Sequence, residues 1–177
     1  IGETITKRYA ANRVFTGYEY FPGGGDYTVP GMKLDVSKET LMDDDGRVFA
    51  QLIGATGEEH PMIMVNAVKV TSIDSNNPVS LSKPIITDWL RKELGFDGVV
   101  ITDDIEVGAA VAGMSIGDYA VRTINAGSDM VIVCNHAKHI KEVHDALTQA
   151  VENGTISEAR LDESVRRIML MKFSNEQ

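Results

Sequence analysis

The sequence contains 177 residues, of which 43% are apolar and 24% are charged, a composition typical of one globular domain (residues 1–177) with a substantial core. The 26 acidic residues outnumber the 17 basic ones, which gives a formal net charge of −9, and the basic residues are scattered along the chain. This charge pattern argues against a nucleic-acid partner.

The first predicted element is a strand over Val14–Tyr20, which is rich in β-branched and aromatic residues. Glycines, Pro30 and an aspartate run fill the stretch from Gly23 to Asp45 that follows it. We therefore predict a long loop over residues 23–45. A loop of this length in a compact domain is more often functional than idle, and we place it on the active-site side.

Three further strands are predicted to alternate with helices. The strands cover Met62–Ala67, Gly98–Thr102 and Met130–Cys134, and the helix before the first of them would use Val48, Phe49, Leu52 and Ile53 as its apolar face. A helix over residues 83–94 is predicted to be capped by Ser82 and stopped by Gly95, and another is predicted to run from Ser115 to Gly127. Two amphipathic helices should follow, around residues 140–151 and from residue 161 onward.

This alternation of strands and helices predicts an α/β fold built from the (β/α) units of a TIM-type barrel, with about four parallel strands. A complete barrel has eight strands and typically about 250 residues, so the sequence predicts a half barrel or a barrel fragment. The chain also begins at Ile1 without a recognisable start. Because a four-stranded half would leave two strand edges unpaired, we expect either self-association or a missing N-terminal half.

Several other kinds of site are not expected. The apolar stretches are too short to cross a bilayer and no export leader opens the chain, so no membrane association is predicted. The single cysteine, Cys134, is predicted to be a buried strand residue. No cofactor is expected, and no metal site, because His136, His139 and His144 lack a correctly spaced carboxylate partner in the sequence.

The third predicted strand ends directly in Asp103 and Asp104. The active site of an α/β barrel gathers at the carboxyl ends of its strands, so one of these two carboxylates should face the mouth of the barrel. There it could act as a nucleophile, a general base or a metal ligand. The alternative is that both carboxylates only cap the turn and helix that follow.

The segment from Leu94 to Ile105, Leu-Gly-Phe-Asp-Gly-Val-Val-Ile-Thr-Asp-Asp-Ile, resembles glycoside hydrolase family 3, close to its β-N-acetylhexosaminidase branch. Further agreement lies at residues 21–23, 80–82, 125–130 and 161–168. The resemblance implies the second half of a catalytic barrel that hydrolyses a β-linked sugar, a β-N-acetylhexosaminide or a β-glucoside, by a retaining mechanism. It also implies that Asp103 is the nucleophile that forms the covalent glycosyl-enzyme.

Other motifs of the family are altered in this chain. Glu19 and Tyr20 stand where the family usually has a sugar-binding Lys and His, and Asn66 stands where it has a His. The Asp-Ser-His element that supplies the general acid/base in this branch is replaced by Pro-Gly-Met at residues 30–32. Asp26 is our candidate for the acid/base, with Glu106 as a second possibility.

The candidate substrate-binding residues are therefore Glu19, Tyr20, Asn66 and Asp104. The resemblance implies a carbohydrate substrate and predicts no compartment, because relatives occur both in the cytoplasm and outside the cell. The alternative to a hydrolase is a non-catalytic descendant of the family that binds a glycan or serves as a structural partner, which the lost motifs favour. The intact Thr102-Asp103-Asp104 sequence favours the enzyme.

Overall fold

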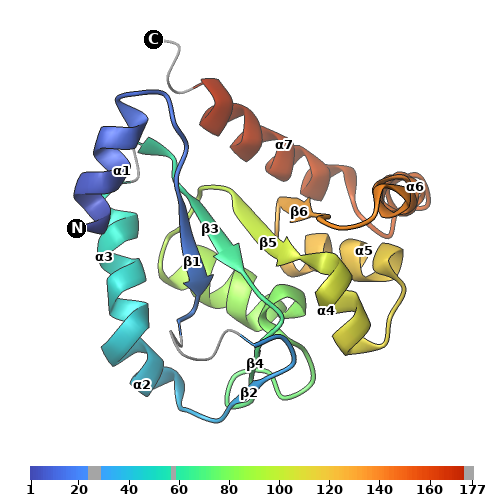
Figure 1. The fold of residues 1–177 in the computed structure, drawn as a ribbon, viewed down its shortest axis with the longest axis horizontal. Helices are drawn as coiled ribbons and strands as arrows, with labels where there is room; N and C mark the ends of the chain where they lie inside the picture. The colour runs from blue at the N-terminus through green and yellow to red at the C-terminus, as the bar shows by residue number, and fades with distance from the viewer. Residues whose placement is uncertain (24–28, 57–58, 174–177) are drawn as a thin grey trace.

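The computed structural model describes residues 1–23, 29–56 and 59–173 and contains a four-stranded parallel sheet (Figure 1). The strands are β1 (Gly17–Phe21), β3 (Met62–Val65), β5 (Val100–Asp104) and β6 (Met130–Ile132), and they pair in the order β1-β3-β5-β6. The predicted parallel sheet in sequential order is therefore confirmed. Strand β5 extends two residues beyond its predicted end, so that both aspartates belong to the strand itself.

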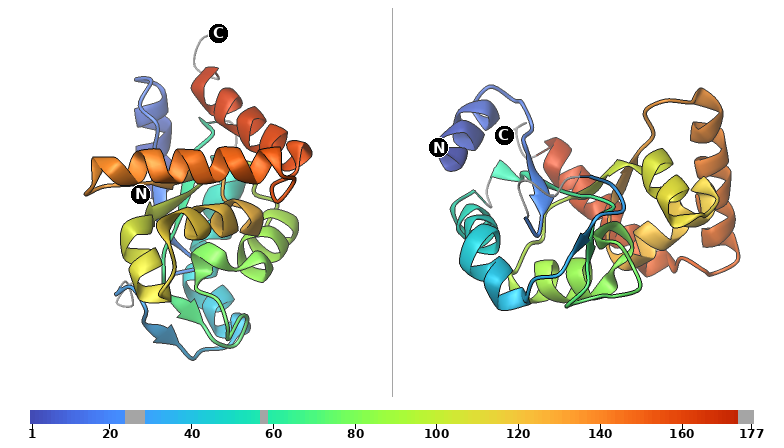
Figure 2. Two further views of the ribbon diagram at one scale, coloured as in Figure 1. Left: turned by 90° about the vertical axis from the view of Figure 1, so that its right-hand side faces the viewer. Right: turned by 60° about the horizontal axis from the view of Figure 1, so that its bottom comes forward.

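Helices connect the strands and flank the sheet. They are α1 (Gly2–Ala10), α2 (Lys38–Leu41), η1 (Met42–Gly46), α3 (Arg47–Ala55), η3 (Val79–Leu81), η4 (Pro84–Glu93), α4 (Ile105–Ala112), α5 (Ile116–Ala126), α6 (Ala137–Glu152) and α7 (Glu158–Phe173). Figure 1 shows α1 and α3 beside β1, with α5 and α6 at the opposite side of the sheet. The further views in Figure 2 show α6 lying along α5, with which it packs. No helix among the described residues is both long and apolar enough to cross a membrane.

One face of the sheet is buried beneath the helices. Along β3, Ile63 and Val65 are fully buried, whereas the alternate residues Met62 and Met64 are only half-buried. Phe21 at the end of β1 packs edge-to-face with Phe49 of α3 and Trp89 of η4, at centroid distances of 5.3 and 5.1 Å. The core therefore lies between the sheet and its outer helices, while the other face is less completely covered, as expected for half of a barrel.

A buried carboxylate, Asp129, joins the sheet to the helices on its outer side. It accepts hydrogen bonds from the backbone N–H of Val100 in β5 (3.0 Å) and from Arg91 of η4 (2.6 Å). On α7, the residues that donate to it are Ser164 at 2.8 Å and Arg160 and Arg167 at 3.3 Å each. The side chain of Asp129 is 0% exposed, so its charge depends on these donors for stabilisation.

The structure corrects several sequence expectations. The predicted loop over residues 23–45 contains β2 (Lys33–Leu34) and α2, and it runs into η1, while residues 24–28 lie outside the described part of the chain. Strand β2 pairs in parallel with β4 (Lys69–Val70), and neither strand was predicted because two residues carry no periodicity. Ser82 does not cap η4, because its hydroxyl donates to Asp74 instead (2.9 Å). Cys134 is exposed, because β6 ends at Ile132.

Candidate active site at the strand ends

Asp103 lies at the carboxyl end of β5, half-buried between neighbouring strands. The backbone of Ala67, just beyond β3, hydrogen-bonds to its carboxylate. Burial raises the pKa of Asp103 to about 7; the hydrogen bond from Ala67 opposes this rise, and the charge of Asp104 adds to it. Burial is the larger cause, because a carboxylate removed from water is disfavoured.

Two tyrosines lie close enough to Asp103 for its charge to raise their pKa values. Burial raises the pKa of Tyr20 at the end of β1, and the charges of Glu19 and Asp103 raise it further. Burial also raises the pKa of Tyr119 in α5 to about 12, and Asp103 contributes to that shift. Asp103 therefore lies near two phenol groups, one on the edge strand β1 and one on α5.

Tyr119 was not a predicted site residue. Its hydroxyl forms a 2.6 Å hydrogen bond with the buried hydroxyl of Ser80, and the backbone N–H of Ser80 donates to the carbonyl of Asn66 (3.0 Å). These two hydrogen bonds connect Tyr119 of α5, through Ser80, to Asn66 in the loop after β3. In the sequence Tyr119 is one apolar position of a helix, so no signal distinguished it.

Asp104 points away from Asp103 toward α4 and the loop after β6. Its Oδ1 accepts hydrogen bonds from the backbone N–H groups of Glu106 (3.1 Å) and Cys134 (3.4 Å), and its Oδ2 accepts from Asn135 Nδ2 (2.7 Å). Asp104 is thus the N-cap of α4, and this bond satisfies an N–H that the helix leaves without a partner. Asp104 therefore caps the helix that follows it, and its predicted role toward a substrate stays a prediction.

Glu19, Tyr20 and Asn66 line a single cavity of about 460 Å³ between β1 and α3. Other lining residues are Gly17, Tyr18, Gly23, Asp45, Val48, Phe49 and Leu52. Glu19 is exposed and hydrogen-bonds to Tyr20, whereas Asn66 is 5% exposed and accepts from the backbone N–H of Val68 (3.2 Å). Three candidate residues therefore share one cavity. Asp26 lies outside the described residues.

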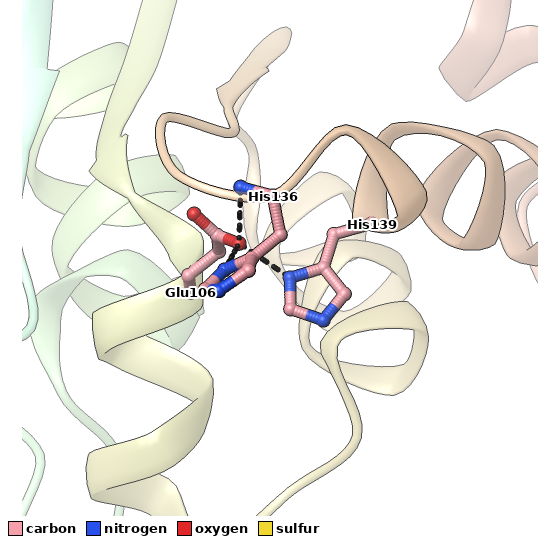
Figure 3. Close-up of side chains that lie close together, drawn as sticks. All are labelled: Glu106, His136 and His139. Carbon is pink, nitrogen blue, oxygen red and sulfur yellow. Dashed lines mark hydrogen bonds and ion pairs between the residues drawn. The ribbon is translucent and has the colours of Figure 1, made fainter.

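A second cluster combines Glu106 of α4 with His136 and His139, at the start of α6 (Figure 3). Burial would raise the pKa of Glu106, but hydrogen bonds from His139, the Asn135 backbone and His136 outweigh it and hold the pKa at about 2. Glu106 is therefore a carboxylate at ordinary pH and a poor proton donor. The sequence argument that the histidines lack a carboxylate partner is wrong for this pair, because the fold brings Glu106 to them. His144 stands apart, exposed and 3.6 Å from Asp145.

The chain matches known proteins over nearly its full length. Residues 2–171 match the family model described as glycosyl hydrolase family 3 N terminal domain. β-Hexosaminidase A of Pseudoalteromonas piscicida is 26% identical over 97% of this chain and 32% of its own length. β-Hexosaminidase of Haemophilus influenzae is 31% identical over 92% of this chain and 47% of its own length.

A solved structure with a similar fold is the glycoside hydrolase family 3 β-N-acetylglucosaminidase from Paenibacillus sp.. It is 29% identical with a TM-score of 0.88, and the match covers 98% of this chain and 34% of that protein. The chain thus spans half or less of the length of these relatives.

Proposed function

Because the chain belongs to glycoside hydrolase family 3 and resembles its β-hexosaminidases, we propose that it forms part of a catalytic barrel that hydrolyses a β-linked sugar with retention. The substrate class is a β-N-acetylhexosaminide or a β-glucoside. The observation that carries the proposal is the position of Asp103, at the carboxyl end of β5 and in contact with the backbone of Ala67. We assign Asp103 as the nucleophile.

In this reaction the carboxylate of Asp103 attacks the anomeric carbon and displaces the leaving-group oxygen, which a second group must protonate. Water then hydrolyses the glycosyl ester and releases the carboxylate. Only ionised Asp103 can attack. Because its pKa is raised to about 7, we expect turnover by this chain to increase as pH rises through neutrality.

The groups proposed to bind the sugar are Glu19, Tyr20 and Asn66, which share the cavity beside β1, together with Asp104 at the end of β5. Carboxylate, phenol and amide groups can each hydrogen-bond to sugar hydroxyls. Asp26 remains the proposed acid/base. Glu106 is a weaker choice, because its pKa of about 2 leaves it without a proton to donate.

The two edge strands, β1 and β6, need partners. In the described sheet each pairs on one side only, and the relatives are at least twice as long as the matched region. We propose that the remaining strands of a barrel, or a second copy of this chain, cover these edges. Light scattering of the purified chain distinguishes the cases, since a stable monomer over a wide concentration range would contradict self-association.

A non-catalytic glycan-binding or structural role is the second candidate. It is favoured by the altered end of the first strand, where Glu19 and Tyr20 replace the Lys and His that the family usually has. In this case the chain would bind a sugar without turning it over.

Covalent labelling tests the two candidates. The chain is incubated with fluorinated β-glycosides, as glucoside and as N-acetylglucosaminide, carrying a dinitrophenolate leaving group that needs little protonation. We expect peptide mapping to place the label on Asp103 in the wild type and in the control Asp145→Asn, an exposed aspartate on α6. Asp103→Asn should not be labelled.

A label on another residue would refute the assignment of the nucleophile. Absence of any label, combined with sugar binding detected by saturation-transfer NMR, would favour the non-catalytic candidate.

A further inference from the structure

We propose that Glu106, His136 and His139 form a binding site for one divalent transition-metal ion of the zinc class. The three residues lie at the starts of two helices. Glu106 is in the first turn of α4, His136 immediately precedes α6, and His139 is in the first turn of α6. Figure 3 shows both imidazole rings turned toward the carboxylate. The site adjoins the end of β5, because Asn135 hydrogen-bonds to both Glu106 and Asp104, but zinc binding there does not require that the chain be a hydrolase.

The ligand atoms already converge. One oxygen or nitrogen from each residue lies within 4.8 Å of the others, and Glu106 Oε1 is 2.8 Å from His136 Nδ1 and in contact with His139 Nδ1. The two ring centroids are 5.0 Å apart, with the ring planes at 58°. Two imidazoles on one tetrahedral zinc, with bonds of about 2.0–2.1 Å, have ring centres about 5 Å apart. Small side-chain rotations would therefore admit an ion.

The hydrogen bonding of the metal-free cluster is crowded at one atom. Glu106 Oε1 accepts from both imidazole rings and also from the backbone N–H of His136 (3.1 Å). A carboxylate oxygen offers about two lone-pair directions, and the three donors at Glu106 Oε1 all lie within 3.1 Å, whereas two of the three at Asp129 Oδ1 lie at 3.3 Å. An ion that replaces both ring N–H donors removes this crowding, because the two ring nitrogens then direct lone pairs at the metal.

A backbone hydrogen bond holds the Glu106 carboxylate in place, and the cluster is exposed to solvent on the side of His136. The other oxygen of Glu106 accepts the backbone N–H of Asn135, which orients the group as outer partners do in metal sites. The Glu106 side chain is 8% exposed, His139 23% and His136 61%. Three protein ligands with an open side would leave a coordination position for water.

The ligand set indicates the class of metal. Two imidazoles with one carboxylate suit zinc and neighbouring transition metals, whereas magnesium and calcium prefer sites made of oxygen atoms alone. A bound ion would tie the loop after β6 to the start of α4.

The test uses the full chain, stripped of metal with a chelator. Isothermal titration with zinc should give one site per chain, and cobalt(II) should produce the intense visible absorption of a tetrahedral complex. His139→Ala and His136→Ala should each weaken zinc binding at least about 10-fold. The matched control is His144→Ala, an exposed histidine of the same helix, which should bind as the wild type does.

Thermal unfolding with and without zinc provides a second readout. At a zinc concentration near the dissociation constant of the wild type, zinc should raise the Tm of the wild type and of His144→Ala, and should raise the Tm of His139→Ala much less. Equal zinc affinity in the wild type and in both His136→Ala and His139→Ala would overturn the proposal. So would a wild-type cobalt spectrum identical to that of the hydrated ion.

Discussion

Replacing Asp129 with Asn should destabilise the chain strongly, because this carboxylate receives more donors than an amide can accept. In the wild type, Oδ2 accepts from Arg91 and from the backbone N–H of Val100, while Oδ1 accepts from α7. An Asn would keep its oxygen toward the three α7 donors and turn its NH₂ group toward the other two. Arg91 and the N–H of Val100 would then face a donor.

The magnitude follows from these two lost bonds. A hydrogen bond to a charged group contributes about 1.5–3 kcal/mol, and a buried backbone N–H left without an acceptor costs about 1–3 kcal/mol. These terms sum to about 2.5–6 kcal/mol, and the cost of breaking buried ion pairs in other proteins, about 3–5 kcal/mol, lies within this range and is the loss that we expect. Since domains are stable by about 5–15 kcal/mol, the variant should retain only part of its stability.

Urea unfolding followed by circular dichroism measures the loss in free energy of unfolding, and a thermal scan measures the change in Tm. At about 2–4 °C per kcal/mol for a chain of this size, Tm should fall by about 6–20 °C. Asp145→Asn is the matched control: the same substitution on an aspartate whose side chain is 56% exposed should change stability little. A loss below about 1 kcal/mol for Asp129→Asn would refute the account of Asp129 as the buried link between the sheet and α7.

Three further predictions concern the strand-end region and the helices around it. The pKa of Asp103 is about 7 in the folded chain and about 3.9 in the unfolded chain, so its proton stabilises the fold below about pH 4 and this contribution is lost as pH rises through 7. The stability of Asp103→Asn relative to the wild type should therefore be greater at about pH 8 than at about pH 5, by no more than about 4 kcal/mol. A difference in urea midpoint between variant and wild type that is the same at the two pH values would contradict this. A Cβ at Gly108 would lie 2.5 Å from the Tyr119 hydroxyl, so Gly108→Ala should cost about 1–3 kcal/mol in urea unfolding, whereas Gly54→Ala, where nothing lies within 4 Å, should not destabilise. Ser115 accepts the backbone N–H of Asp118 at 3.1 Å, so Ser115→Ala should lower the free energy of unfolding by about 1 kcal/mol, and Ser115→Asp should restore it.

The sequence predicted the sheet because its signals are local. Each strand is a short β-branched run, and Ser115 and Gly127 bound α5 as predicted. Helix α4 was missed, because its sequence is rich in Gly, Ala and Val and because its N-cap, Asp104, was interpreted as a site residue. The expected cap at Ser82 failed, because Asp74 competes for its hydroxyl, which no local pattern reveals.

The candidate site was predictable only in part. The strand-end position identified Asp103, the family resemblance implied Glu19, Tyr20 and Asn66, and the structure places these last three around one cavity. The roles of these residues stay predictions. The carboxylate beside His136 and His139 could not be found from spacing, because Glu106 is 30 residues earlier in the chain than His136. Only the parallel pairing of β5 with β6 brings them together.

The Asp129 link also has a consequence for the order of events during protein synthesis. Its partners Arg160, Ser164 and Arg167 all follow it in the chain, and the last of them is 38 residues later. At about 5–20 residues per second, a ribosome needs about 2–8 s to make that segment. Throughout this interval we expect the nascent sheet to carry an acidic group that it cannot bury completely. The outer face of β5 should therefore close only after α7 has been made, which sets a lower limit on when a growing chain can reach its native state.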